Sequence, residues 1–202
     1  MEKAFEIIGD VKDVVISTSV DGMPQGRIIT VFHYDDGGLY FLTCKTKPFY
    51  REIIGNNHVS MTCINDEYVQ VRVIGEAREI VGNELLMFIK NNPSFQGLFE
   101  TKEKSGKFVL FYLSKGKGET FDISGREAEK VRERFAFGGY TVNEAGCSIT
   151  DSCTSCGDCI IACPFNCISK GKPFVINKRY CVECGLCYKA CTHGAIELPK
   201  GM

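Results

Sequence analysis

Short runs of hydrophobic residues separated by turn-forming residues dominate the first 125 positions of the chain. Runs rich in β-branched and aromatic residues, bounded by Gly, Pro, Asn or Asp, are typical of strands. The pattern predicts strands over 13–20, 25–34, 39–43, 59–64, 68–80, 108–114 and 119–123. The glycine-rich tip between the last two is expected to join them as a hairpin. Several short strands with few helices predict a closed or partly closed antiparallel barrel.

Helical periodicity interrupts this strand pattern at four places. Pro48 suits the first turn of a helix, and Asn83 is expected to cap another. A charged stretch near the end of the region predicts a last helix that leaves the domain. The predicted helices span 4–11, 48–56, 83–90 and 125–136.

A different pattern with an internal repeat begins near residue 148. Four cysteines at 153, 156, 159 and 163 recur 28 positions later, since 181 − 153, 184 − 156, 187 − 159 and 191 − 163 all equal 28. Four equal offsets indicate a duplicated unit with a pseudo-twofold axis. We therefore expect a first domain over 1–138, a linker over 139–147 and a second domain over 148–202, giving a mainly β domain followed by a small α+β domain.

Charge and cysteine content narrow the functions that the chain can have. The 202 residues carry 24 basic and 25 acidic side chains, so nothing in the net charge of −1 favours a nucleic-acid partner. The first residues lack an apolar signal core, and apolar runs are far shorter than a membrane span, so we expect a cytoplasmic protein without a membrane partner. Ten of the 12 cysteines follow residue 140, which indicates a local site instead of a chain-wide disulfide framework.

Each repeat reads Cys-x-x-Cys-x-x-Cys-x-x-x-Cys, the spacing of a 4Fe–4S cassette. Three cysteines on a tight loop wrap one cluster, whereas the fourth lies on the following helix and serves the other cluster. The sequence therefore predicts one cluster on Cys153, Cys156, Cys159 and Cys191, and a second on Cys181, Cys184, Cys187 and Cys163.

The alternative to iron–sulfur clusters is structural zinc, which also uses four cysteines but usually as two separated pairs. Two adjacent cassettes, the first followed by Pro164, favour clusters. This segment resembles bacterial-type two-cluster ferredoxins, and the resemblance implies low-potential, one-electron transfer. Thr192 departs from it, because such ferredoxins usually carry a second proline there. A core or structural role is expected for Cys44, Cys63, Cys167 and the three histidines, and none is assigned to Cys147.

The barrel region gathers groups that suit an anion near one edge. Arg27 and Thr30 lie on the second predicted strand, and hydroxyl and ammonium groups follow the third strand just before Pro48. Such groups next to a helix N-terminus suit a phosphate. The alternative reading is a solvated turn with scattered lysines at Lys45 and Lys47.

The order GRIITVFHYDDGGLYFLTCKTKPFYREIIGNN, followed by HVSMTCINDEYVQVRVIGEAREI, resembles the pyridoxamine 5′-phosphate oxidase-like FMN-binding split barrels over roughly residues 5–125. The resemblance implies a homodimer with each flavin at the subunit interface; a deazaflavin is the alternative cofactor. The family's arginine-lysine turn appears here as Thr46-Lys47. The residues that the resemblance assigns to the flavin are Arg27, Ile28, Ile29, Thr30, Leu42, Thr43, Thr46, Lys47 and Gln70.

Together the two halves predict an anaerobic FMN and iron–sulfur oxidoreductase. Clusters carry single electrons and FMN accepts one or two, so a flavin beside clusters converts between the two modes. Two 4Fe–4S clusters are expected to take electrons from a low-potential donor protein and pass them to FMN, which reduces a small-molecule acceptor. The alternatives are a non-enzymatic electron-transfer protein, that is, a flavin-bearing ferredoxin, and a redox or oxygen sensor.

Overall fold

The computed structural model describes residues 1–99, 107–124, 131–142 and 146–199. The chain forms two compact units. The first comprises Met1–Asp66, Gln70–Gly118 and Phe135–Thr141, and the second comprises Glu67–Val69, Glu119–Arg134 and Val142–Met202. Chain segments that precede residue 135 therefore contribute to both units.

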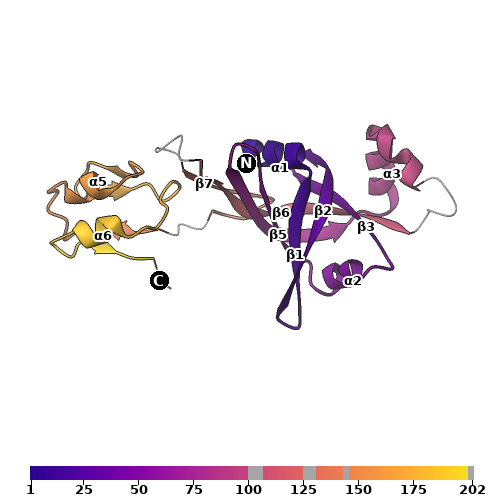
Figure 1. Cartoon of the computed structure of the whole chain (residues 1–202), viewed down its shortest axis with the longest axis horizontal. Coiled ribbons are helices and arrows are strands. Elements are labelled where there is room, and N and C mark those ends of the chain that lie inside the picture. Colours follow the sequence, from indigo (N-terminus) through magenta and orange to yellow (C-terminus); the bar gives the residue numbers. More distant parts are fainter. Residues whose placement is uncertain (100–106, 125–130, 143–145, 200–202) are drawn as a thin grey trace. The chain divides into compact units, whose positions relative to one another are not determined.

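Seven strands form the sheet that carries the first unit (Figure 1). Their order is β3-β2-β1-β4-β5-β6-β7, and an additional pairing of β3 with β6 closes six of them into an antiparallel barrel. The strands are β1 (Asp13–Val20), β2 (Met23–Asp35), β3 (Gly38–Cys44), β4 (His58–Ile64), β5 (Val69–Glu79), β6 (Phe108–Asp122) and β7 (Arg132–Phe137). The predicted barrel is confirmed.

Alternation of buried and exposed positions along the strands fills the barrel with apolar side chains. Phe41 and Phe111 stack there with ring centroids 5.5 Å apart, and both side chains are fully buried. Helix α1 (Glu2–Val11) buries Phe5 and Ile8 on one face. Phe5 packs edge to face on Phe137 at 5.1 Å. This core belongs to the barrel alone.

Three further helices and a short 3-10 turn complete the first unit. Helix α2 (Pro48–Gly55) starts at the predicted proline and buries Phe49 and Ile53. Helix α3 (Gly82–Asn91) begins one residue before Asn83, so the expected cap at Asn83 is wrong: Val81 occupies the N-cap position without a side-chain hydrogen bond. The 3-10 turn η1 (Pro93–Phe95) and helix α4 (Gln96–Phe99) follow.

The predicted hairpin at 115–118 is wrong, because β6 runs as one strand through it. Its glycines serve close strand packing and not a turn. A Cβ atom on Gly116 would overlap the carbonyl oxygen of Ile74, and one on Gly118 would overlap that of Arg72. Only glycine lets the backbones approach this closely.

The predicted helix over 125–136 is wrong where the structure describes it, because Arg132–Phe137 form strand β7. Residues 125–130 lie outside the described residues. Alternation decides the strand: Phe135 and Phe137 are buried while Ala136 between them is only partly buried. Both rings pack on Phe5, a tertiary contact that overrides the helical preference of the charged stretch.

The second unit contains two similar halves, each with one short helix. Helices α5 (Asp158–Ala162) and α6 (Leu186–Ala190) start 28 residues apart. Strand β8 (Ser148–Ile149) pairs with β11 (Ile196–Glu197), and β9 (Ile168–Ser169) pairs with β10 (Val175–Ile176). Left-handed backbone recurs with the same offset, at Ser155, Gly157 and Asn166 and then at Glu183, Gly185 and Gly194. The sequence repeat is thus a structural repeat.

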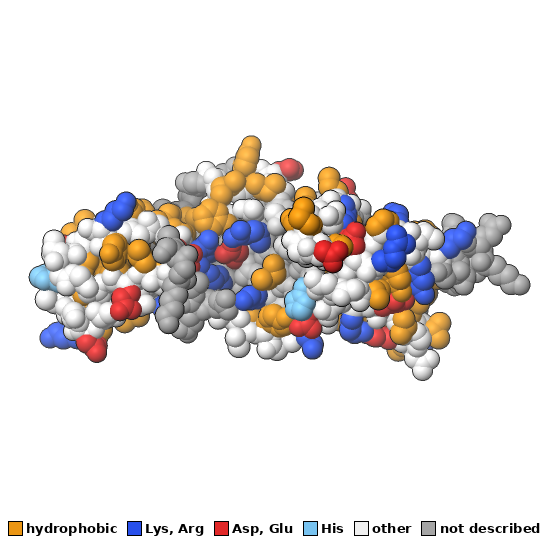
Figure 2. All heavy atoms as spheres, turned by 90° about the horizontal axis from the view of Figure 1, so that it is seen from below, with side chains coloured by type: hydrophobic (Ala, Val, Ile, Leu, Met, Phe, Trp, Pro, Cys, Tyr) orange, Lys and Arg blue, Asp and Glu red, His pale blue; other side chains and the backbone are white. Residues whose placement is uncertain are grey.

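The surface of the described residues carries charges of both signs. On the face shown in Figure 2, basic and acidic side chains are interspersed with hydrophobic ones. Each helix within the described ranges is too short or too polar to cross a membrane.

Candidate functional site

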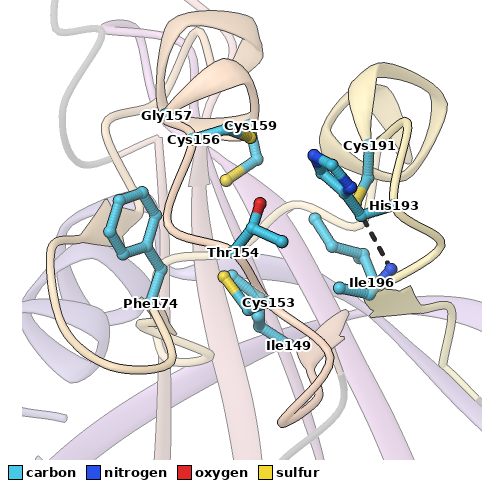
Figure 3. Close-up of a pocket in the computed structure, with 11 residues that line it drawn as sticks. Ile149, Cys153, Thr154, Cys156, Gly157, Cys159, Phe174, Cys191, His193 and Ile196 are labelled. Carbon is cyan, nitrogen blue, oxygen red and sulfur yellow. Dashed lines mark hydrogen bonds between the residues drawn. The ribbon is translucent and has the colours of Figure 1, made fainter.

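The four cysteines predicted for the first cluster line one cavity. Cys153 and Cys156 come from one loop, which the left-handed Gly157 turns into α5, and Cys159 lies in the first turn of that helix. Cys191 reaches the cavity from the end of α6, on the opposite side of the view in Figure 3. Phe174, Ile149 and Ile196 cover the remaining walls.

The four cysteines predicted for the second cluster line a separate cavity. Cys181 and Cys184 come from the loop before α6, Cys187 lies in the first turn of α6, and Cys163 follows the end of α5. The structure thus brings together both sets in the crossed arrangement that the spacing predicts: the fourth cysteine of each repeat faces the loop of the other. The ligation itself stays a prediction.

Each cavity gathers the four predicted ligands of one cluster. Within the described ranges no three metal-ligating side chains are close enough to share one metal ion. In a 4Fe–4S cubane each cysteine binds a different iron atom, so the four sulfurs surround a space and do not meet at a point. Each of the two cavities has four predicted ligands around it, three from one repeat and one from the other.

Backbone amides at the first cavity donate hydrogen bonds to two of the predicted ligands. The amide of Ser155 donates to Cys153 Sγ at 3.4 Å, and that of Ala195 donates to Cys191 Sγ at 3.3 Å. Backbone hydrogen bonds from Phe174 and Ser155 lower the pKa of Cys153. Hydrogen bonds to cluster ligands also help to set the reduction potential.

The second cavity is more buried and richer in sulfur. Burial first, and neighbouring thiols second, raise the pKa of Cys187 to about 12. Cys147 is fully buried and hydrogen bonds Cys187, although its place in the sequence outside both cassettes gave no signal for this. Cys167 also lines this cavity, but its thiol donates to the carbonyl oxygen of Phe165 at 3.4 Å.

In the barrel, the predicted flavin residue Arg27 already has an internal partner. Its guanidinium lies 2.6 Å from Glu52 Oε2 on α2 and donates to Thr18 Oγ1 at 2.7 Å. It also lies over the ring of Phe49, 4.7 Å from the centroid. The positive charge of Arg27 is therefore balanced by Glu52 before any ligand binds, a pairing that the sequence pattern did not reveal.

The other predicted flavin residues lie where β2 and β3 diverge and at the start of α2. Val31 of β2 pairs with Phe41 of β3. Beyond this pair, β2 carries Thr30, Ile29 and Ile28, and β3 carries Leu42 and the buried Thr43. The hydroxyl of Thr30 donates to Asp13 at 2.7 Å. Thr46 and Lys47 are exposed, with Lys47 at the N-cap of α2. Among the described residues Lys47 has no ion-pair partner, in contrast to Lys45, which lies 3.8 Å from Glu79.

Gln70 belongs to the outward surface of four neighbouring strands, which we call the outer face. One row of cross-strand partners on it is Ile28, Val15, Thr62 and Arg72, and the next is Gly26, Ser17, Ser60 and Ile74. Gln70 pairs with Ile64 at its edge. Apolar side chains are prominent there: Ile28 is 73% exposed, and Val15, Ile64 and Ile74 are 45–47% exposed.

A hollow of about 330 Å³ lies over part of the outer face, lined by hydroxyl groups of β1 and β4, by Asn56 and His58, and by Tyr140. The turn at Gly138 and Gly139 brings Tyr140 back to the sheet, where its hydroxyl donates to Glu76 at 2.7 Å. None of the predicted flavin residues lines this hollow. No pattern in the sequence indicates this hollow, because its walls come from four separate segments of the chain.

Comparison with known proteins agrees with the cysteine geometry. The family model "4Fe-4S binding domain" matches residues 148–169 and 174–197. Residues 148–197 form a 4Fe–4S binding domain. Ferredoxin-1 of Caulobacter vibrioides is 40% identical to this chain over 52 residues, which is 24% of this chain and 46% of the ferredoxin. The chain thus spans about half the length of this curated relative.

The first part of the chain is similar to solved barrels. A NimC/NimA family protein of Clostridium acetobutylicum superposes with a TM-score of 0.55 at 22% identity, covering 68% of this chain and 92% of that protein. A protein of the same organism related to general stress protein 26, of the pyridoxinephosphate oxidase family, gives 0.50 at 11% identity, covering 67% and 92%. The N-terminal part therefore has the split-barrel fold of that family.

Proposed function

We propose that this chain is a cytosolic FMN and iron–sulfur oxidoreductase that takes electrons from a low-potential donor protein and reduces a small acceptor. The observation that carries the proposal is the pair of cavities, each lined by the four cysteines predicted to bind one cluster, three from one repeat and one from the other, in one chain with a split barrel. Bound clusters would supply one-electron transfer, and bound FMN would supply exchange between one-electron and two-electron chemistry.

The residues of the barrel support a flavin phosphate at the start of α2. Lys47 and Thr46 are exposed there, and the positive end of the helix dipole at the N-terminus of α2 favours an anion. Since Arg27 is paired with Glu52 and Lys47 is exposed at the N-cap of α2, Lys47 is the better candidate for the phosphate charge. A deazaflavin with a phosphate in the same place is the alternative ligand.

A homodimer through the outer face completes the proposal. Contiguous exposed apolar side chains on a sheet are typical of protein interfaces. Ile28, Val15 and Thr62 stand in one cross-strand row, and Ile28 is part of the segment assigned to the flavin. Association through this face would cover the apolar side chains and bring a second subunit to the edge of the flavin site.

The test of the proposal is the cofactor content and turnover of anaerobically purified protein. We expect about eight irons and eight acid-labile sulfides per chain, together with bound FMN, and turnover with small oxidants. Zinc without sulfide would contradict the cluster assignment. Cofactors without turnover would favour the electron-carrier alternative, and regulation without turnover would favour a sensor.

A second prediction concerns how the barrel holds the phosphate. We expect Lys47→Ala to weaken FMN binding by about 1.5–3 kcal/mol, because a charge-assisted hydrogen bond is lost, and to leave riboflavin binding unchanged. Fluorescence titration of the flavin-free protein with each ligand measures both affinities. The matched control is Lys45→Ala, since Lys45 already lies beside Glu79. Equal loss of FMN and riboflavin affinity in Lys47→Ala would show that Lys47 does not bind the phosphate.

A further inference from the structure

Two nearly buried arginines of β7 bind the loop of the second cassette. The side chains of Arg132 and Arg134 are only 12% and 10% exposed. Arg134 Nη2 lies 2.9 Å from Glu183 Oε1, and its Nη1 donates to the carbonyl oxygens of Lys178 and, at 3.3 Å, Cys181. Arg132 Nη1 lies 3.3 Å from Glu183 Oε2 and 3.4 Å from the Cys181 oxygen. All of these residues belong to the second unit.

The contacts converge on one of the predicted cluster ligands and its neighbour. Cys181 is the first cysteine of its cassette, and Glu183 stands between Cys181 and Cys184 with left-handed backbone at φ 62°. A carboxylate and a carbonyl oxygen next to the ligands are thus both held by guanidinium groups. Charge-assisted hydrogen bonds of this kind are stronger than neutral ones, and burial protects them from screening.

The first cassette differs at the equivalent position. Ser155, 28 residues before Glu183, has the same left-handed backbone at φ 59°, but its hydroxyl donates to the carbonyl oxygen of Gly171 at 3.3 Å. Two homologous loops therefore have unlike surroundings at this position: one makes a neutral hydrogen bond from a hydroxyl to a carbonyl oxygen, and the other makes ion pairs with nearly buried arginines.

We propose that Arg134, with Arg132, is a positioning residue that fixes the second cluster loop and raises the reduction potential of the cluster on Cys181, Cys184, Cys187 and Cys163. A cluster gains negative charge on reduction, so a nearby positive charge favours its reduced form and a nearby negative charge opposes it. Charge, hydrogen bonding and exposure are the properties by which proteins tune such clusters. The inference rests on the two-cluster part of the proposed function and adds an energetic difference between the clusters.

Opposite effects of two substitutions separate tuning from simple bracing. Arg134→Gln and Glu183→Gln break the same ion pair. If the pair only held the loop in place, both variants would change the reduction potential in the same direction. Tuning by charge predicts a lower potential when the positive charge is removed and a higher potential when the negative charge is removed. Arg134→Lys keeps the charge and is expected to keep most of the wild-type potential.

The experiment is a potentiometric titration of the full-length holoprotein followed by EPR, with iron and sulfide measured on each sample. We expect one of the two midpoint potentials to fall in Arg134→Gln and to rise in Glu183→Gln, while the other stays in place. The expected change in the ratio of reduced to oxidised cluster is about tenfold or less, which corresponds to at most about 59 mV for one electron.

The matched control is Arg179→Gln, which removes the same charge from the same unit but from an exposed pair with Glu133, where the Arg179 side chain is 53% exposed. We expect both potentials to stay within error. The proposal would be overturned if the potential moved in the same direction in Arg134→Gln and Glu183→Gln, or if it moved in neither variant. An equal shift of the potential in Arg179→Gln would overturn it as well. If Arg134→Gln loses the second cluster, the potentials of Arg134→Lys and Glu183→Gln test the proposal: the first should stay near the wild-type value and the second should rise. Wild-type protein with half the expected iron would instead refute the two-cluster assignment.

Discussion

Replacing Cys191 with Ser is expected to remove the cluster of the distant loop Cys153–Cys159 and to leave the cluster of its own repeat in place. Cys191 lines the first cavity together with Cys153, Cys156 and Cys159, although its own cassette surrounds the second. Iron content is expected to fall from about eight to about four per chain. Iron and sulfide analysis, with EPR of the reduced protein, measures the loss.

The reciprocal variant Cys163→Ser should remove the other cluster, because Cys163 lines the second cavity. Cys167→Ser is the matched control: Cys167 lines the same cavity but stands outside the cassette, and we expect it to keep both clusters. Adding Cys184→Ser to Cys191→Ser shows which cluster survives in the single variant. Cys184 lines the second cavity, so the double variant should lose the remaining iron. Iron retained by that double variant would show that the crossed assignment is wrong.

The features that could be predicted from sequence are those that local spacing determines. Equal offsets of 28 between the cassettes predicted a duplicated unit, and α5 and α6 repeat with that offset. Runs of β-branched and aromatic residues bounded by turn-forming residues predicted the strands of the barrel, since such side chains pack well on a half-buried sheet. Pro48 marked the start of α2 in the same way.

The features that sequence could not reveal depend on contacts between distant segments. The glycines of β6 look like a turn in the sequence, and only the carbonyl oxygens of β5 behind them show that they permit close packing. The stretch before Phe137 looks helical until Phe5 is found against it. The same holds for the charges: the pairing of Arg27 with Glu52 joins residues on β2 and α2, and that of Arg134 with Glu183 spans 49 positions.

These long-range pairs change what the site residues are expected to do. Arg27 resembles a phosphate ligand in sequence, whereas in the structure it holds α2 against β1 and β2 through Glu52 and Thr18. Its removal would leave a largely buried carboxylate unpaired, which is costly. Loss of flavin binding in an Arg27 variant would therefore report on the barrel as much as on the phosphate.

The last prediction concerns electron transfer from the clusters to the flavin. We expect full-length protein freed of both clusters by Cys156→Ser and Cys184→Ser to bind FMN normally, because the barrel has its own apolar core around Phe41 and Phe111. Its flavin should still be reduced by a chemical reductant, but it should lose most of its fast reduction by a one-electron protein donor. Stopped-flow absorbance measures both rates, and the wild-type chain should show cluster bleaching before or together with flavin reduction.

One chain carries both the barrel and the cassettes, and this tethering keeps the clusters and the flavin at a high effective concentration. The control is wild-type protein mixed with the cluster-free variant, which shows how much electron transfer occurs between separate molecules. If the cluster-free variant accepts electrons from the protein donor as fast as the wild type, the clusters are not the route to FMN. The chain would then be a carrier with two independent redox centres, in which the crossed cassettes serve a partner other than the flavin of the barrel.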